Sequence, residues 1–186
     1  MRTLVSYTFL LLISAAILPI FLIVSVLILI FSGFPIIHWS KRVGKDEKIF
    51  YMAKFRTMKS NTPQIATHLL EDPLNHVTWL GRFLRKTSLD EIPQIINLLK
   101  LDMQIVGPRP ALFNQYDLIA KRRIKGINKI KPGITGLAQI NGRDNMSIDE
   151  KVDYDYAYIN NKSFFYDVRI ILITIVKIIY IKNIIH

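Results

Sequence analysis

The 186-residue chain contains no cysteine. Disulfide bonds, thiolate nucleophiles and cysteine-based zinc sites are therefore excluded. Histidine is scarce, and the few present show no spacing typical of metal ligands. They are His38, His68, His76 and His186. There is also no Ser-His-Asp order and no Walker-type phosphate loop, which argues against a hydrolase and against a P-loop nucleotidase.

Acidic residues are few compared with basic ones. Lys and Arg number 25 against 14 Asp and Glu, which gives a net charge of +11. A charge this basic favours polyanions, namely nucleic acid, nucleotide phosphates or the anionic headgroups of a cytoplasmic leaflet. Apolar residues make up 51% of the chain and concentrate at its two ends, which indicates contact with lipid rather than a larger core. The length allows one catalytic domain with an appendage.

The N-terminal region lacks charge over a long stretch. No charged side chain occurs from residue 3 to residue 40, and Leu10 to Phe31 is almost wholly apolar. At a rise of ~1.5 Å per residue, these residues extend about 33 Å as a helix, enough to reach across a ~30 Å hydrocarbon core. A cleaved signal peptide has a shorter apolar region. We therefore predict a membrane helix within residues 1–33.

Pro19 lies near the middle of this segment, where it removes a helical hydrogen bond and bends the axis. A bend lets both ends emerge on one side of the membrane, but proline kinks also occur in helices that span it. The residues leave both topologies open. Four cations that follow the segment place the rest of the chain on the cytoplasmic face. They are Lys41, Arg42, Lys45 and Lys48.

Residues 34–186 form the expected catalytic domain, of a mostly helical α+β class. Apolar periodicity and capping signals predict a strand or short extended segment over Ile49–Phe55 and four helices. The helices are Thr78–Leu84, Leu89–Leu101, Asn114–Ile124 and Ser147–Ile159. Residues 63–73 read as loop plus partial helix, residues 107–110 as a rigid loop, and residues 131–133 and 135–136 as turns. Val168–Ile181 is either an interfacial amphipathic helix or a β-branched core helix or strand.

The most informative stretch surrounds two adjacent acids, Asp90 and Glu91. A structural interpretation makes them the start of a helix, with Ser88 as a cap three residues before Glu91. A functional interpretation uses the same geometry. An ionised aspartate at a helix N-terminus can attack phosphorus as a covalent nucleophile, and Arg85 and Lys86 can attract the phosphate.

Three further basic segments are candidate ligand sites. Arg109 stands between two prolines on the rigid loop, which favours a fixed guanidinium for phosphate. Lys54 and Arg56 form a basic cluster at the end of the expected strand. Lys131 begins a segment whose glycines allow close approach of a ligand to the backbone. Each segment alone is equally compatible with a turn or a solvated charged surface.

In their order along the chain, these motifs resemble those of the bacterial sugar transferase family, the monotopic phosphoglycosyl transferases. The resemblance covers nearly the whole chain. The matching runs are Arg42–Gly44, Lys54–Met58, Gly81–Gln94, Asp102–Met103, Ile105–Pro110 and Lys131–Arg143, followed by Glu150, Lys151, Asp155, Tyr158, Asn161 and Asp167.

The resemblance implies a specific reaction. Asp90 would attack the β-phosphorus of a UDP-sugar, release UMP and carry the phosphosugar as a covalent ester. Polyprenol (undecaprenyl) phosphate would then accept the phosphosugar. Asp90 and Glu91 would also hold Mg²⁺. The implied substrate-binding positions are Arg85, Arg109, Arg56, Lys54 and Lys131.

The resemblance also implies a setting. The N-terminal helix would be re-entrant, with its bend at Pro19, and the enzyme would sit on the cytoplasmic face of the bacterial inner membrane. There it would initiate glycoconjugate synthesis beside membrane lipid and downstream glycosyltransferases, without nucleic acid. Two departures lie near the acids, since Leu101 replaces a usual Gly and Gln104 a usual Ser. The alternative is a membrane-tethered basic binding module without catalysis. The motifs do not identify the sugar that the UDP-sugar donor carries.

Overall fold

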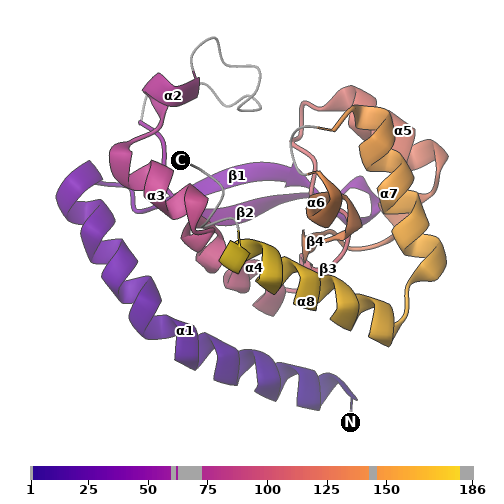
Figure 1. The fold of residues 1–186 in the computed structure, drawn as a ribbon, viewed down its shortest axis with the longest axis horizontal. Coiled ribbons are helices and arrows are strands. Elements are labelled where there is room, and N and C mark those ends of the chain that lie inside the picture. Colours follow the sequence, from indigo (N-terminus) through magenta and orange to yellow (C-terminus); the bar gives the residue numbers. More distant parts are fainter. Residues whose placement is uncertain (1, 60–61, 63–72, 143–145, 181–186) are drawn as a thin grey trace.

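A computed structural model describes residues 2–59, 62, 73–142 and 146–180, with side chains described for residues 16–59, 62, 75–142 and 146–178. It confirms a mostly helical α+β arrangement around two small sheets (Figure 1). The helices are α1 (Arg2–Ser32), α2 (Pro73–His76), α3 (Trp79–Lys86), α4 (Ile95–Leu99), α5 (Tyr116–Ile124), α6 (Leu137–Asn141), α7 (Ile148–Asn161) and α8 (Phe164–Tyr180). Short 3-10 helices are η1 (Lys45–Glu47), η3 (Leu89–Gln94) and η4 (Ile127–Lys129).

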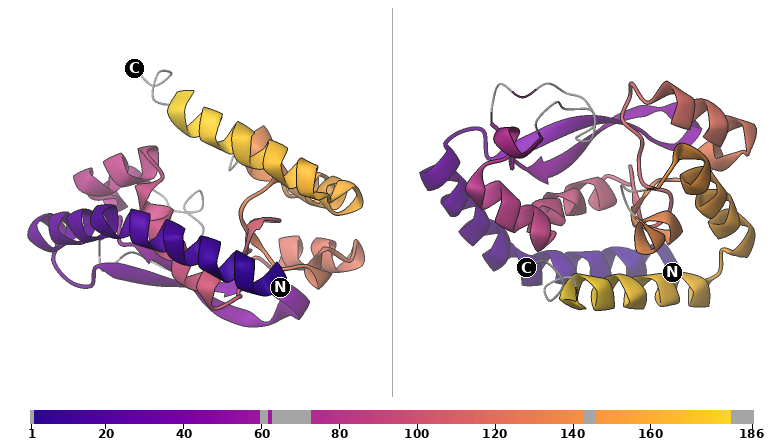
Figure 2. Two further views of the ribbon diagram at one scale, coloured as in Figure 1. Left: turned by 90° about the horizontal axis from the view of Figure 1, so that it is seen from below. Right: turned by 45° about the horizontal axis from the view of Figure 1, so that its top comes forward.

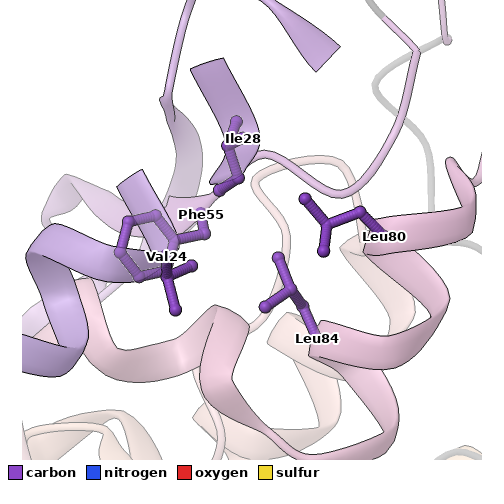
Figure 3. Packing of buried hydrophobic residues seen from close by; sticks show 5 residues of the cluster. All are labelled: Val24, Ile28, Phe55, Leu80 and Leu84. Carbon is purple, nitrogen blue, oxygen red and sulfur yellow. The ribbon is translucent and has the colours of Figure 1, made fainter. Parts of the chain in front are cut away.

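Helix α1 continues through Pro19, and Figure 1 shows that its axis changes direction along its length. Its C-terminal half packs on the domain through Val24 and Ile28, which are buried against β2 and α3 (Figure 3). The other side of the same turns leaves apolar residues exposed, among them Ile23 and Ile30. Among the residues whose side chains the structure describes, no helix is long and apolar enough to cross a membrane.

The first sheet is an antiparallel hairpin of β1 (Ile37–Val43) and β2 (Ile49–Phe55). Strand β2 was predicted and is confirmed. Strand β1 was not predicted, because its mixture of apolar, polar and basic residues shows no regular alternation. The register pairs His38 with Lys54, which places both side chains on one face of the hairpin.

The second sheet pairs β3 (Gln104–Val106) with β4 (Gly133–Thr135) in parallel. The prediction of turns at residues 131–133 and 135–136 is therefore wrong for Gly133 and Thr135, which belong to β4. A strand of three residues is too short to show the alternation of apolar and polar residues by which strands are predicted. Beyond the strands, Gly107 donates its N–H to Thr135 O at 2.8 Å, and Gly133 donates to Pro108 O at 2.9 Å. A Cβ on Gly133 would lie 2.1 Å from Gly107 N, so glycine is required for this close approach. The rigid loop at 107–110 is confirmed by these bonds.

The segment predicted as one helix over Leu89–Leu101 is instead η3 followed by α4, which ends at Leu99. Pro93 lies inside η3, where it lacks a backbone donor. Ser88 has φ 58° and makes no side-chain capping bond, so its predicted role as a cap is wrong. Leu101 also takes a left-handed conformation, with φ 61°.

The remaining helices follow their end signals. The capping box of Ser147 and Glu150 at the start of α7 is confirmed. The helix predicted over Thr78–Leu84 is confirmed as α3, with Thr78 as its cap, and α5 starts two residues later than expected. The predicted loop with partial helix at residues 63–72, and Ile181 at the end of the final apolar segment, lie outside the described residues.

The final apolar segment is a helix, α8, which excludes the strand alternative. Ile170 is buried against Val106 and Tyr158, whereas Leu172 and Val176 on the same helix are more than half exposed. Helix α8 therefore has one side in the core and another open to its surroundings. The left view of Figure 2 shows α8 lying apart from α1 across the molecule.

Candidate active site

A cavity of about 1090 Å³ lies between α1, the β1–β2 hairpin, η3 and α8. Its wall is polar where β2, η3 and the loop after β3 meet, and that part holds both acids. Apolar residues also line it, among them Ile17 of α1 and Ile178 of α8, the latter beside the polar Thr174 and Lys177. A cavity with both charged and apolar lining residues suits a ligand that has a charged head and an apolar tail.

The two acids have different surroundings. Glu91 Oε1 accepts a hydrogen bond from Lys54 Nζ at 2.8 Å and another from the Arg109 guanidinium at 3.0 Å. Asp90 is 8% exposed, and its carboxylate lies 3.9 Å from Lys54 Nζ. Glu91 is thus held by two cations, whereas Asp90 borders the cavity with a single, longer ion pair.

The electrostatics separate the acids further. Burial alone would raise the pKa of Glu91, but Lys54 and Arg109 outweigh burial and hold that pKa well below its usual range. Burial raises the pKa of Asp90; Lys54 opposes this shift and the Glu91 charge reinforces it. The two cations beside Glu91 therefore favour its ionised form, whereas burial disfavours the ionised form of Asp90.

Arg85, at the end of α3, donates from Nε to Thr57 Oγ1 at 2.9 Å, and both residues line the cavity. His38 lines it too, opposite Lys54 in the hairpin register. Partial burial, together with Arg42, Lys54 and Arg85, lowers the pKa of the His38 imidazole. His38 was missed from the sequence because nothing there revealed strand β1.

Arg56 is buried and has a structural role that was not predicted. Its guanidinium donates to Phe34 O at 2.8 Å, to Gly33 O at 2.6 Å and to Ser32 O. These carbonyls include the end of α1, where backbone acceptors lack helical partners. Arg56 therefore fastens α1 to β2. Its predicted contact with substrate stays a prediction.

Behind the loop that carries Arg109 lies a buried ion pair. Arg122 of α5 donates from Nε and Nη2 to Asp155 Oδ2 of α7, at 3.0 and 2.6 Å. Its third nitrogen donates to the backbone carbonyl of Arg109 at 2.8 Å. Asp155 appeared among the matching motif residues, but no sequence signal paired it with Arg122.

The sequence matches the family model described as bacterial sugar transferase over residues 1–180. The chain belongs to the bacterial sugar transferase family. The chain is 42% identical over 161 residues to the galactosyl transferase CpsE of Streptococcus agalactiae, covering 77% of this chain and 34% of that protein. It is 40% identical over 152 residues to the uncharacterized sugar transferase EpsL of Bacillus subtilis, covering 82% and 74% respectively.

A third relative carries a more explicit name. The UDP-glucose:undecaprenyl-phosphate glucose-1-phosphate transferase of Escherichia coli is 38% identical over 172 residues, which cover 86% of this chain and 36% of that protein. The chain therefore spans about a third of the length of CpsE and of the E. coli enzyme, but three quarters of EpsL.

Most of the site residues expected from the sequence meet in one place. The cavity wall brings together Lys54, Arg56, Arg85, Asp90, Glu91 and Arg109. Lys131 lies outside the described lining of this cavity, and its backbone carbonyl accepts from Gln104 Nε2 at 2.9 Å. Lys131 therefore lacks the placement that the other candidates share.

The carboxylate oxygens of the two acids suit Mg²⁺ when substrate phosphates complete its ligands. Among the described residues there is no group of three His, Asp or Glu side chains that could hold a metal. Mg²⁺ commonly binds through one or two carboxylates together with substrate phosphates. Asp90 and Glu91 are such a pair, and Asp90, which lacks the two close cations of Glu91, is the better oxygen donor.

Proposed function

We propose that the protein is a phosphoglycosyl transferase that moves a sugar-1-phosphate from a UDP-sugar to polyprenol phosphate. The observation that carries the proposal is the acidic pair in the cavity, with Glu91 held by Lys54 and Arg109 and Asp90 left at the cavity wall. The family membership and the names of the relatives support the same substrate class.

In the first step an Asp90 carboxylate oxygen attacks the β-phosphorus of the donor. The bond from that phosphorus to the bridging oxygen breaks, and UMP leaves with the electron pair. Lys54 and Arg109 stabilise charge on the phosphate oxygens, and Arg85 faces the same cavity. The phosphosugar is then an ester of Asp90.

In the second step an oxygen of polyprenol phosphate attacks the same phosphorus. The bond to Asp90 breaks, which restores the carboxylate and yields a polyprenyl diphosphate-sugar. Since UMP leaves before the acceptor reacts, the kinetics are ping-pong.

Mg²⁺, held by Asp90 and Glu91 with the donor diphosphate, would supply charge neutralisation at the phosphates. The chain's own contribution is to keep Glu91 ionised beside its cations. This leaves Asp90, which has one longer ion pair, as the acid that reacts.

The location proposed for the enzyme is the cytoplasmic face of the bacterial inner membrane, with α1 inserted as a re-entrant helix. Exposed apolar side chains on α1 and α8, such as Ile23, Ile30 and Leu172, support contact with lipid. The apolar residues that line the cavity, among them Ile17 and Ile178, support entry of an acceptor that has an isoprenoid tail.

Substitution of Asp90 by Asn tests the function. We expect the parent to release UMP from at least one of UDP-glucose, UDP-galactose and their N-acetylated forms, with undecaprenyl phosphate as acceptor. Asp90→Asn should abolish turnover and remain folded, because the amide keeps the shape of the side chain but is not a nucleophile. Radiolabelled donor should leave a sugar phosphate on the parent and none on the variant.

The matched control is Asp153→Asn, the same chemical change at an exposed ion pair on α7. It should leave UMP release unchanged. Full activity of Asp90→Asn would remove Asp90 from the mechanism. Salt-dependent binding of arbitrary DNA, with no UMP release from any donor, would favour the basic binding module instead.

A further inference from the structure

We propose that the buried Arg122–Asp155 pair is a positioning device that sets the loop of Arg109, and through it the diphosphate-binding geometry of the site. Neither residue was among the candidate site residues. The inference rests on the proposed function, because the loop matters through the ligand that Arg109 binds.

The contacts form a continuous path from the core to the acids. Asp155 is 1% exposed and accepts from two nitrogens of Arg122. The remaining Arg122 nitrogen donates to Arg109 O at 2.8 Å, and the Arg109 side chain donates to Glu91 at 3.0 Å. One guanidinium thus connects a fixed carboxylate in α7 to the backbone of the residue that binds Glu91.

Comparison with neighbouring pairs separates this role from ordinary helix packing. Helices α5 and α7 share two other ion pairs, Lys121 with Asp149 and Lys125 with Asp153, and both are exposed. Within the described residues, neither of the exposed pairs forms a hydrogen bond with the loop at 107–110. The Arg122 side chain is 12% exposed and lines the cavity, so of these three ion pairs the one that contains Arg122 reaches the site.

The chemistry of arginine explains why this residue type is needed. Its planar fork donates in several fixed directions at once, whereas an ammonium is a compact point charge. Arg122→Lys preserves a cation beside Asp155 but cannot keep all three bonds in this geometry. The expected defect is a loosened Arg109 loop rather than an unpaired buried charge.

Two measurements on the full chain test the role, with UDP as the probe. Arg122→Lys should weaken UDP binding about tenfold, since small misplacements of a binding group are costly. Combined with Arg109→Ala, it should add little to the loss caused by Arg109→Ala alone, because both act through one side chain. Amide hydrogen exchange in a peptide covering residues 107–113 should accelerate in Arg122→Lys, with or without ligand.

Lys125→Ala is the control, as it removes a neighbouring α5–α7 pair, and it should leave both measurements at parental values. Asp155→Asn should reproduce the effects of Arg122→Lys; if it fails to fold, the lysine variant carries the test. A folded Arg122→Lys with parental UDP affinity and parental exchange would overturn the inference. Independent, multiplicative losses in the double variant would do the same. A parent that does not bind UDP would contradict the proposed function, while the exchange measurement still reports on the loop.

Discussion

Single side chains in this protein take their roles from neighbours that lie far away in the sequence. Glu91 is fixed by Lys54 from β2 and by Arg109 from the loop after β3. The acids themselves could be predicted as a reactive pair. The different roles of the two acids could not be predicted, because they depend on which acid contacts the cations. The role of Arg56 also depends on distant residues. Its position in a basic motif does not predict the hydrogen bonds that it donates to carbonyls at the end of α1.

His38 provides a prediction at this scale. Its imidazole should titrate below the ordinary histidine value, because partial burial and the cations Arg42, Lys54 and Arg85 disfavour the charged form. Added UDP should raise this pKa, since a diphosphate in the cavity favours the imidazolium. Proton NMR of the histidine ring, with His38→Gln to assign the signal, measures both values. A His38 pKa that saturating UDP leaves unchanged would place the diphosphate elsewhere.

At the scale of elements, the long helices were predictable and the short strands were not. Helix α7 has its capping box and α3 its cap Thr78, so local chemistry marks where each begins. Strands β3 and β4 have three residues each, and their pairing depends on contact between Gly107 and Gly133. Such contacts are tertiary, and no local pattern reveals them.

Leu101 follows the end of α4 in a left-handed conformation that glycine adopts without strain, which agrees with the Gly that the family resemblance implies at this position. Relief of that strain, less the chain entropy that glycine loses on folding, should make Leu101→Gly more stable by about 0.5–1 kcal/mol. Thermal unfolding should shift upward by about 2–3 °C. Leu101→Ala, which shortens the side chain but keeps the strain, is the control and should show no gain.

Arg56 allows a test that separates its two interpretations. Arg56→Met removes the donors to the α1 carbonyls, and a bond to a charged group contributes about 1.5–3 kcal/mol. We expect the melting temperature to fall by several degrees, together with faster proteolysis near residues 30–36. Arg82→Met, on the exposed side of α3, serves as the control. An unchanged melting temperature with a raised KM for the UDP-sugar would show that substrate binding is the role of Arg56.

At the scale of the whole molecule, the main prediction concerns the path of α1 relative to a bilayer. The helix changes direction along its length and contains Pro19, which suits a re-entrant path. Because the chain has no cysteine, Thr3→Cys gives a unique label. In inverted and right-side-out vesicles, we expect an impermeant maleimide to reach this cysteine only from the cytoplasmic side. Labelling from the opposite side would mean that the helix spans the bilayer. Lys48→Cys, in the domain, is the control for orientation.

The 3-10 geometry of η3 makes the order of the two acids chemically meaningful. With three residues per turn, consecutive side chains point about 120° apart, so Asp90 and Glu91 cannot share one direction. A chain with the two acids exchanged would have the same composition and net charge. It would nevertheless place the longer side chain where Asp90 has one long ion pair, and the shorter one where Glu91 meets Lys54 and Arg109. The order of the two acids therefore matters, because exchanging them would change which acid meets the cations and so alter the function of the site.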